Sequence, residues 1–237
     1  MKQFINRSCL LVFFFVLLSF SGTQALTIWG ADASGELIGS RTNSGGGGVD
    51  AAGPWDDGIF TISWDISEDS SGIWTYVYSI GIPSNKVSHF ILEVTEDEEP
   101  FTTYEGTSGP AEKIYGPGTF SSASEYPSTN PSMPNAIYGL WFDFGGGAPE
   151  YTIVTDRAPV YGVFYTSDGT YVDADGNVKD VVAWSNALNS SDYKTSESLT
   201  ATDFIVRPDG YAAPIPGSVW LLGSGLLGLV GMSRKRT

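Results

Sequence analysis

The chain is almost free of cysteine, since only Cys9 of its 237 residues is one and it lies in an apolar N-terminal segment. The remainder has no thiol, which excludes a disulfide framework, a cysteine nucleophile and cysteine metal ligands. Histidine is equally scarce: His89 alone cannot build a zinc site. A Ser-His-Asp triad needs a nucleophile and an orienting acid, and nothing local suggests either. The favoured interpretation of His89 is a sheet histidine that points to solvent or has a satisfied partner.

Charge is also in short supply, at 16% of residues against the roughly 25% usual in soluble domains. Only 12 bases face 27 acids, for a net charge of −15. A shortage of bases disfavours nucleic-acid binding, and the 41% of hydrophobic residues excludes intrinsic disorder. No Gly-x-Ser-x-Gly or phosphate loop is present. Among 27 acids, some pair would match glycosidase spacing by chance. We therefore expect no enzymatic activity, with a secreted glycan hydrolase or lyase as a less favoured alternative.

Sustained helical periodicity is missing before residue 214, whereas β-branched and aromatic residues recur in short alternating runs. These runs predict strands. The runs 59–66 and 73–80 are joined by a short polar turn, which predicts a hairpin. The glycine run at 44–49 and the Gly-, Ser- and Pro-rich segment 106–135 are predicted loops. The sequence therefore predicts an all-β protein with a single β-sandwich-like domain over residues 26–213. The predicted strands are residues 59–66, 73–80, 87–94, 137–144, 151–154, 160–166, 178–184 and 203–207.

The N-terminus has the three parts of an export signal. Lys2 and Arg7 are its positive region, and the apolar run 10–18 follows. A small-x-small pattern ends at Ala25, which predicts a signal peptide over residues 1–25 and cleavage between Ala25 and Leu26.

The C-terminus has a second membrane-directed pattern over residues 214–237. A proline motif comes first and interrupts any preceding structure. The uncharged apolar segment 218–232 follows, and a basic cluster stops it on the cytoplasmic side. This order predicts a transmembrane sorting helix. The motif is Pro214, Ile215, Pro216 and Gly217, and the membrane stop is Arg234, Lys235 and Arg236.

The segment 214–236 resembles the PEP-CTERM sorting signal, with Ile215 where that motif has Glu. Tails of this type are also labelled "ice-binding protein C-terminal domain", a label that implies nothing about ice. The resemblance implies a Gram-negative bacterium that exports polysaccharide, and removal of the tail by an exosortase-like membrane transpeptidase. Segments 87–94 and 156–165 are similar to parts of uncharacterised PEP-CTERM proteins, a similarity that brings no chemistry.

Together these features predict an exported cell-surface or extracellular-matrix protein, structural or adhesive and associated with exopolysaccharide. Its partners would be signal peptidase and the export machinery, the exosortase-like enzyme and, transiently, the inner membrane; no nucleic acid is expected. The final location would be the outer cell surface or the exterior. Loss of both ends removes five bases, so 7 bases face 27 acids and the body carries −20.

Two residue groups in the body are candidates for binding. Asp173, Asp175 and Asn177 carry oxygen ligands at alternate positions, as the start of a calcium loop does. The favoured interpretation is a hairpin turn without a cofactor, and calcium is the weaker alternative. Trp74, Tyr76 and Tyr78 lie on one face of a predicted strand. The favoured interpretation is that they fill the core; the alternative is an exposed sugar-stacking row, which would make the domain a carbohydrate-binding module.

Overall fold

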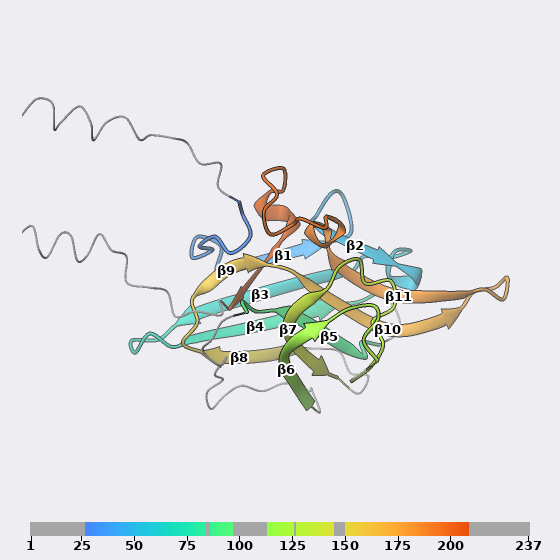
Figure 1. The fold of residues 1–237 in the computed structure, drawn as a ribbon, viewed down its shortest axis with the longest axis horizontal. Helices are drawn as coiled ribbons and strands as arrows, with labels where there is room; N and C mark the ends of the chain where they lie inside the picture. The colour runs from blue at the N-terminus through green and yellow to red at the C-terminus, as the bar shows by residue number, and fades with distance from the viewer. Residues whose placement is uncertain (1–26, 84–85, 97–112, 126, 145–149, 209–237) are drawn as a thin grey trace, which may run out of the picture.

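The computed structural model describes residues 27–83, 86–96, 113–125, 127–144 and 150–208. These residues form antiparallel strands in three sheets, joined by loops and three short 3₁₀ segments (Figure 1). The prediction of an all-β, sandwich-like domain is confirmed. The predicted signal peptide and the sorting tail lie outside the described residues. Within the described part, no helix combines the length and the apolar character that a membrane span requires.

Two sheets enclose the main core, and a two-stranded ribbon lies beside them. The four-stranded sheet has the order β1-β3-β4-β8, and the six-stranded sheet has the order β2-β11-β10-β5-β7-β6. The ribbon pairs β9 with β12. The bounds are β1 (Ile38–Thr42), β2 (Val49–Ala52), β3 (Thr61–Glu68), β4 (Trp74–Gly81), β5 (His89–Glu93), β6 (Lys113–Phe120), β7 (Ile137–Asp143), β8 (Glu150–Thr155), β9 (Pro159–Gly162), β10 (Phe164–Val172), β11 (Val178–Ser185) and β12 (Ile205–Pro208), with 3₁₀ turns η1 (Gly53–Trp55), η2 (Asn186–Asn189) and η3 (Ala201–Asp203).

The central part of the six-stranded sheet is buried on both faces, whereas its edge strand β6 is mostly exposed. The inner face of the sheet shares an aromatic-rich core with the four-stranded sheet, in which Tyr151 of β8 packs against Phe90 and Phe142. On its outer face a second cluster includes Trp141 and Tyr165, covered by side chains from the loop segments around residues 120–137 and 187–204. Because both faces are covered, all five residues of β5 are buried.

The structure departs from the predicted strands in three respects. Segment 106–135 was predicted to be a loop, yet β6 lies within it. An edge position and a register shift between Tyr115 and Gly118 accommodate Pro117 there. The run 160–166, predicted as one strand, is divided at Val163, because β9 pairs with β12 whereas β10 pairs with β5 and β11. The strands β1 and β2 were not predicted.

Candidate functional site

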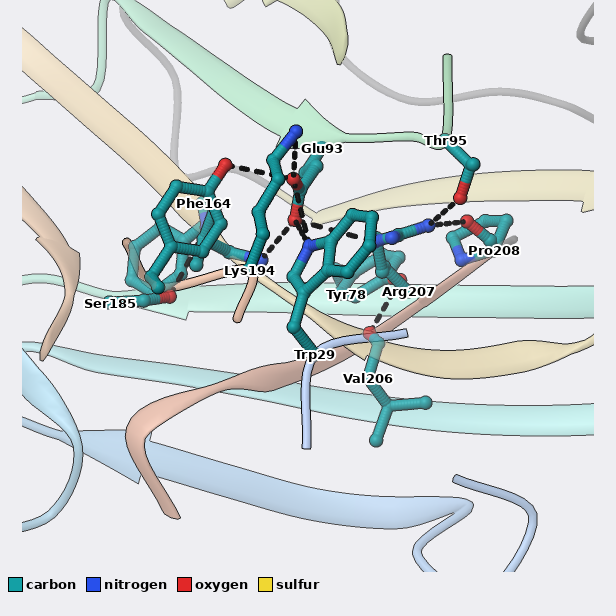
Figure 2. A network of polar contacts seen from close by, with 12 residues as sticks. Trp29, Tyr78, Glu93, Thr95, Phe164, Ser185, Lys194, Val206, Arg207 and Pro208 are labelled. Atoms are coloured by element: carbon teal, nitrogen blue, oxygen red, sulfur yellow. Dashed lines mark hydrogen bonds and ion pairs between the residues drawn. The ribbon is translucent and has the colours of Figure 1, made fainter. Parts of the chain in front are cut away.

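A buried carboxylate with several protein partners is that of Glu93, the last residue of β5, which is 0% exposed. Trp29 Nε1 donates to both carboxylate oxygens at 3.0 Å. The Tyr193 hydroxyl donates to Oε1 at 2.9 Å, and the Val163 amide donates to Oε2 at 3.0 Å. These four contacts fill the roughly four acceptor positions of a carboxylate. Figure 2 shows them converging on the buried side chain.

Two cations lie against the same carboxylate. Arg207 Nε is 3.6 Å from Oε2, and the Arg207 side chain is 0% exposed. Lys194 Nζ is 3.6 Å from Oε1, but its side chain is 43% exposed. Both cations also lie over the Trp29 ring, at 5.0 Å for Lys194 Nζ and 5.8 Å for the Arg207 guanidinium carbon (Figure 2). We name Trp29, Glu93, Tyr193, Lys194 and Arg207 the Glu93 network.

The position of the Glu93 network follows from the way the chain passes between sheets. At Val163 the chain leaves the β9–β12 ribbon and enters β10, and the Glu93 carboxylate accepts the amide hydrogen at this point. Gly162, immediately before it, has no side chain, and a Cβ there would lie 2.0 Å from Arg207 Nε. A glycine is therefore required for the guanidinium to approach β9.

Both ends of the described body meet at β9. On one edge, residues 30–33 pair with it: the Gly30 amide donates to the Tyr161 carbonyl at 2.8 Å, and the Tyr161 amide donates to the Ala31 carbonyl at 3.1 Å. On the other edge β9 pairs with β12, which carries Arg207. Trp29 and Arg207 then meet the same carboxylate. The Glu93 network therefore links the two ends of the body to each other.

This arrangement suits a structural role: the Glu93 carboxylate binds groups of the protein itself rather than acting as an acid or base on a bound molecule. Both Glu93 oxygens accept two hydrogen bonds each from the protein. Burial, followed by the nearby Glu93 charge and its hydrogen bond, raises the pKa of Tyr193, so its hydroxyl stays protonated and donates. Buried donors and acceptors that satisfy one another are costly to separate.

A second ionic contact reinforces the same end of the molecule. Arg41 of β1 binds Glu36 through two nitrogens, at 2.8 and 3.1 Å, in the bidentate arrangement favoured by guanidinium and carboxylate. Arg41 also donates to the carbonyls of Phe204 and Ala201, each at 2.9 Å. The Tyr161 hydroxyl donates to Glu36 Oε2 at 3.0 Å. Arg41 and Glu36 therefore hold the segment before β12 against β1 and β9.

His89 is a buried histidine with a partner, one of the two environments expected for it. It is 1% exposed, its Nε2 lies 3.0 Å from Asn130 Oδ1, and its ring stacks on Trp141 at 4.9 Å. Burial is the main cause that lowers its pKa from 6.5 to about 4. Asn130 donates through Nδ2 to the Ser121 carbonyl, so its oxygen faces His89, and the ring donates from Nε2. His89 therefore fastens the loop after β6 to the sheet.

Asp173, Asp175 and Asn177 lie in the turn between β10 and β11, which confirms the predicted hairpin. Asp173 Oδ1 accepts from the amides of Asp175 and Asn177, at 3.0 and 2.8 Å. Gly176 has a φ of 84°, which suits glycine in such a turn. Among the described residues no group of three or more His, Cys, Asp or Glu is placed to hold a metal. Calcium binding at these three residues stays a hypothesis.

For Trp74, Tyr76 and Tyr78 the prediction of core filling is confirmed, and the alternative of an exposed sugar-stacking row is wrong. This face of β4 packs into the main core, with Tyr76 and Tyr78 fully buried and Trp74 partly buried. The Tyr76 hydroxyl donates to the Arg157 carbonyl at 2.6 Å, and the Tyr78 hydroxyl donates to the Val206 carbonyl at 2.9 Å. The aromatic rings fill the core, while their hydroxyls satisfy backbone groups next to β9 and in β12.

The pairing of Glu93 with Arg207 was not predicted from the sequence. One sequence feature pointed to this pairing. The apolar run 90–93 ends in an acidic residue, and the apolar run 204–207 ends in a basic one. Buried charges are rare unless they are paired, so the two could have been matched. Arg41 and Glu36 carried no comparable signal, because neither lies in an apolar run.

Comparison of the chain with protein-family models, curated proteins and solved structures found no match.

Proposed function

We propose that this chain is an exported cell-surface or matrix protein whose body is a self-contained β-sandwich-like module between two sorting segments. The signal peptide would be residues 1–25, and the PEP-CTERM-like tail would be residues 214–237. The module would have a structural or adhesive role in association with exopolysaccharide.

The observation that supports this proposal is the Glu93 network. Trp29 stands four residues after the proposed cleavage site at Ala25, and Arg207 stands seven residues before Pro214. Both are held by one buried carboxylate. Removal of the two sorting segments would leave every member of the network in place. A module processed at both ends needs this property, because cleavage must not unfold it.

The charge distribution agrees with an extracellular structural role. The three arginines between residues 27 and 208 are buried, namely Arg41, Arg157 and Arg207. Basic groups on the surface of the described body are therefore lysines, against a large excess of acids. A net charge far from zero keeps a protein soluble and limits non-specific association.

The proposal is tested by the intact mass of the protein recovered from the exterior of producing cells. We expect a chain that begins at Leu26 and ends near Pro214. A Pro216→Ala variant, altered in the sorting motif alone, should accumulate with its tail in the membrane fraction. Recovery of unaltered chain from the exterior with Arg236 still in place would contradict exosortase-type processing.

A further inference from the structure

The outward face of the four-stranded sheet is rich in hydroxyl groups, interrupted by a row of Ile38, Asp65 and Val77. On β3, the residues Ile62, Trp64 and Ile66 point into the core, so the alternate positions point outward. The same alternation applies to β1, β4 and β8. Apart from Gly81, thirteen positions point outward with a side chain; eight of them are Ser or Thr, two are acidic, and none is basic or aromatic. These positions are Ile38, Ser40, Thr42, Thr61, Ser63, Asp65, Ser67, Thr75, Val77, Ser79, Glu150, Thr152 and Val154. We name this surface the hydroxyl face.

The strand register aligns these side chains in rows. Ser40, Ser63 and Ser79 stand opposite one another on three neighbouring strands, and Glu150 ends the row. Thr42 and Thr61 form the start of a parallel row. Neighbouring members of a row are separated by about 4.8 Å, and successive rows by about 7 Å, as the dimensions of a β-sheet require. These hydroxyl groups can accept hydrogen bonds, and those that do not already donate within the sheet can also donate. In the central row, Ser63 Oγ donates to the Ser79 carbonyl at 3.3 Å and Ser79 Oγ donates to Glu150 Oε2 at 3.2 Å.

This face differs in charge from the protein as a whole. Among its thirteen described positions, Asp65 and Glu150 are the acidic ones. Acidic residues gather instead at turns, such as Asp56 and Asp57 after η1. The hydroxyl face is therefore a surface on which an uncharged partner can make close contact without meeting a concentrated negative field.

We propose that the hydroxyl face binds a neutral polysaccharide chain laid across the strands. Sugar hydroxyls and protein hydroxyls are complementary, because each both donates and accepts. An apolar partner would leave the Ser and Thr groups without partners, which costs free energy, and a polyanion would be repelled by the acidic body. This inference rests on the proposed function and specifies its glycan. Without an aromatic platform each module binds weakly, and many modules in one matrix supply avidity.

The test is retention of the detergent-solubilised full-length chain on insoluble cellulose, mannan and cross-linked dextran, with alginate gel as the anionic comparison. Ser63→Glu places a charge in the middle of the hydroxyl face, and Ser40→Glu does the same on its edge strand. Ser191→Glu is the matched control, because Ser191 lies in the segment that covers the opposite side of the sandwich. Circular dichroism establishes whether each variant is folded. If one of the two face variants does not fold, the other alone is enough for the test.

We expect retention on at least one neutral glycan, reduced about fivefold or more by a face variant and unchanged by Ser191→Glu. Absence of retention on all three neutral glycans, retention on alginate alone, or equal retention of folded face variants and parent would overturn the inference. Sorting is judged separately by the intact mass of exported protein. Correct processing without glycan retention would therefore reject this inference and leave the proposed function standing.

Discussion

Mild acid should destabilise this fold through His89. The ring is buried and donates from Nε2 to Asn130, whose own amide is fixed by the Ser121 carbonyl. Burial is the largest cause that lowers the His89 pKa from 6.5 to about 4. The Asn130 hydrogen bond and the charge of Asp143 both raise the His89 pKa, but by less than burial lowers it. Asp143 lies opposite His89 on β7.

The direction of the pH effect follows from which state binds the proton. Above pH 6.5 the histidine is neutral in both the folded and the unfolded chain, so it adds no pH dependence. Between 6.5 and about 4 the unfolded chain takes up a proton that the folded chain excludes. Stability therefore falls as the pH falls through this window, by about 2 kcal/mol near pH 5 and by about 3 kcal/mol at the lower end.

The assay is urea unfolding followed by tryptophan fluorescence across this pH range, for the parent and for a His89→Gln variant. Carboxylates also titrate at the acidic end, but they do so in both proteins. The difference between the two pH profiles therefore isolates the histidine. We expect the parent to lose about 2 kcal/mol more than the variant between pH 7 and pH 5. Parallel profiles would refute a buried, neutral His89.

Three substitutions, with two comparison variants, test the packing and the Glu93 network by urea or thermal unfolding. Glu93→Gln should cost about 3 to 5 kcal/mol, because it leaves a buried guanidinium without its carboxylate, whereas the exposed Glu96→Gln should stay within about 0.5 kcal/mol. Gly162→Ala should cost about 1 to 3 kcal/mol, since the new Cβ would lie 2.0 Å from a guanidinium nitrogen. Tyr78→Phe should cost about 1 to 3 kcal/mol by orphaning a buried carbonyl. Tyr151→Phe should be neutral or stabilising, because that buried hydroxyl has no hydrogen-bond partner in the described structure. Equal losses in the two tyrosine variants would count against the hydrogen-bond argument.

The strands that could be predicted were those whose own residues carry the pattern. Residues 59–66 and 73–80 alternate strongly, and β3 and β4 form there as a hairpin. The strands that escaped prediction lack this signal: β6 contains Gly116, Pro117 and Gly118, and an edge position tolerates them. The division at Val163 is likewise invisible locally, because the pairing partners of β9 and β10 lie elsewhere in the chain.

The site was harder to predict than the fold, because it depends on contacts between distant segments. Alternation in an antiparallel strand normally leaves every second side chain in water. In β5 this would expose Glu93, but loop side chains cover the outer face of its sheet and bury the carboxylate. Glu93 and Arg207 are separated by 114 positions in the sequence, and no local periodicity relates them.

We infer that contacts among the body's own residues hold both of its ends in place, so that it needs neither sorting segment to fold. The most direct measurement is the thermal unfolding of a chain of residues 26–213, compared with a chain of residues 26–203 that lacks β12 and Arg207. The account predicts a single cooperative transition for the longer chain and its loss in the shorter one. Equal stability of the two chains, or an unfolded 26–213, would contradict it.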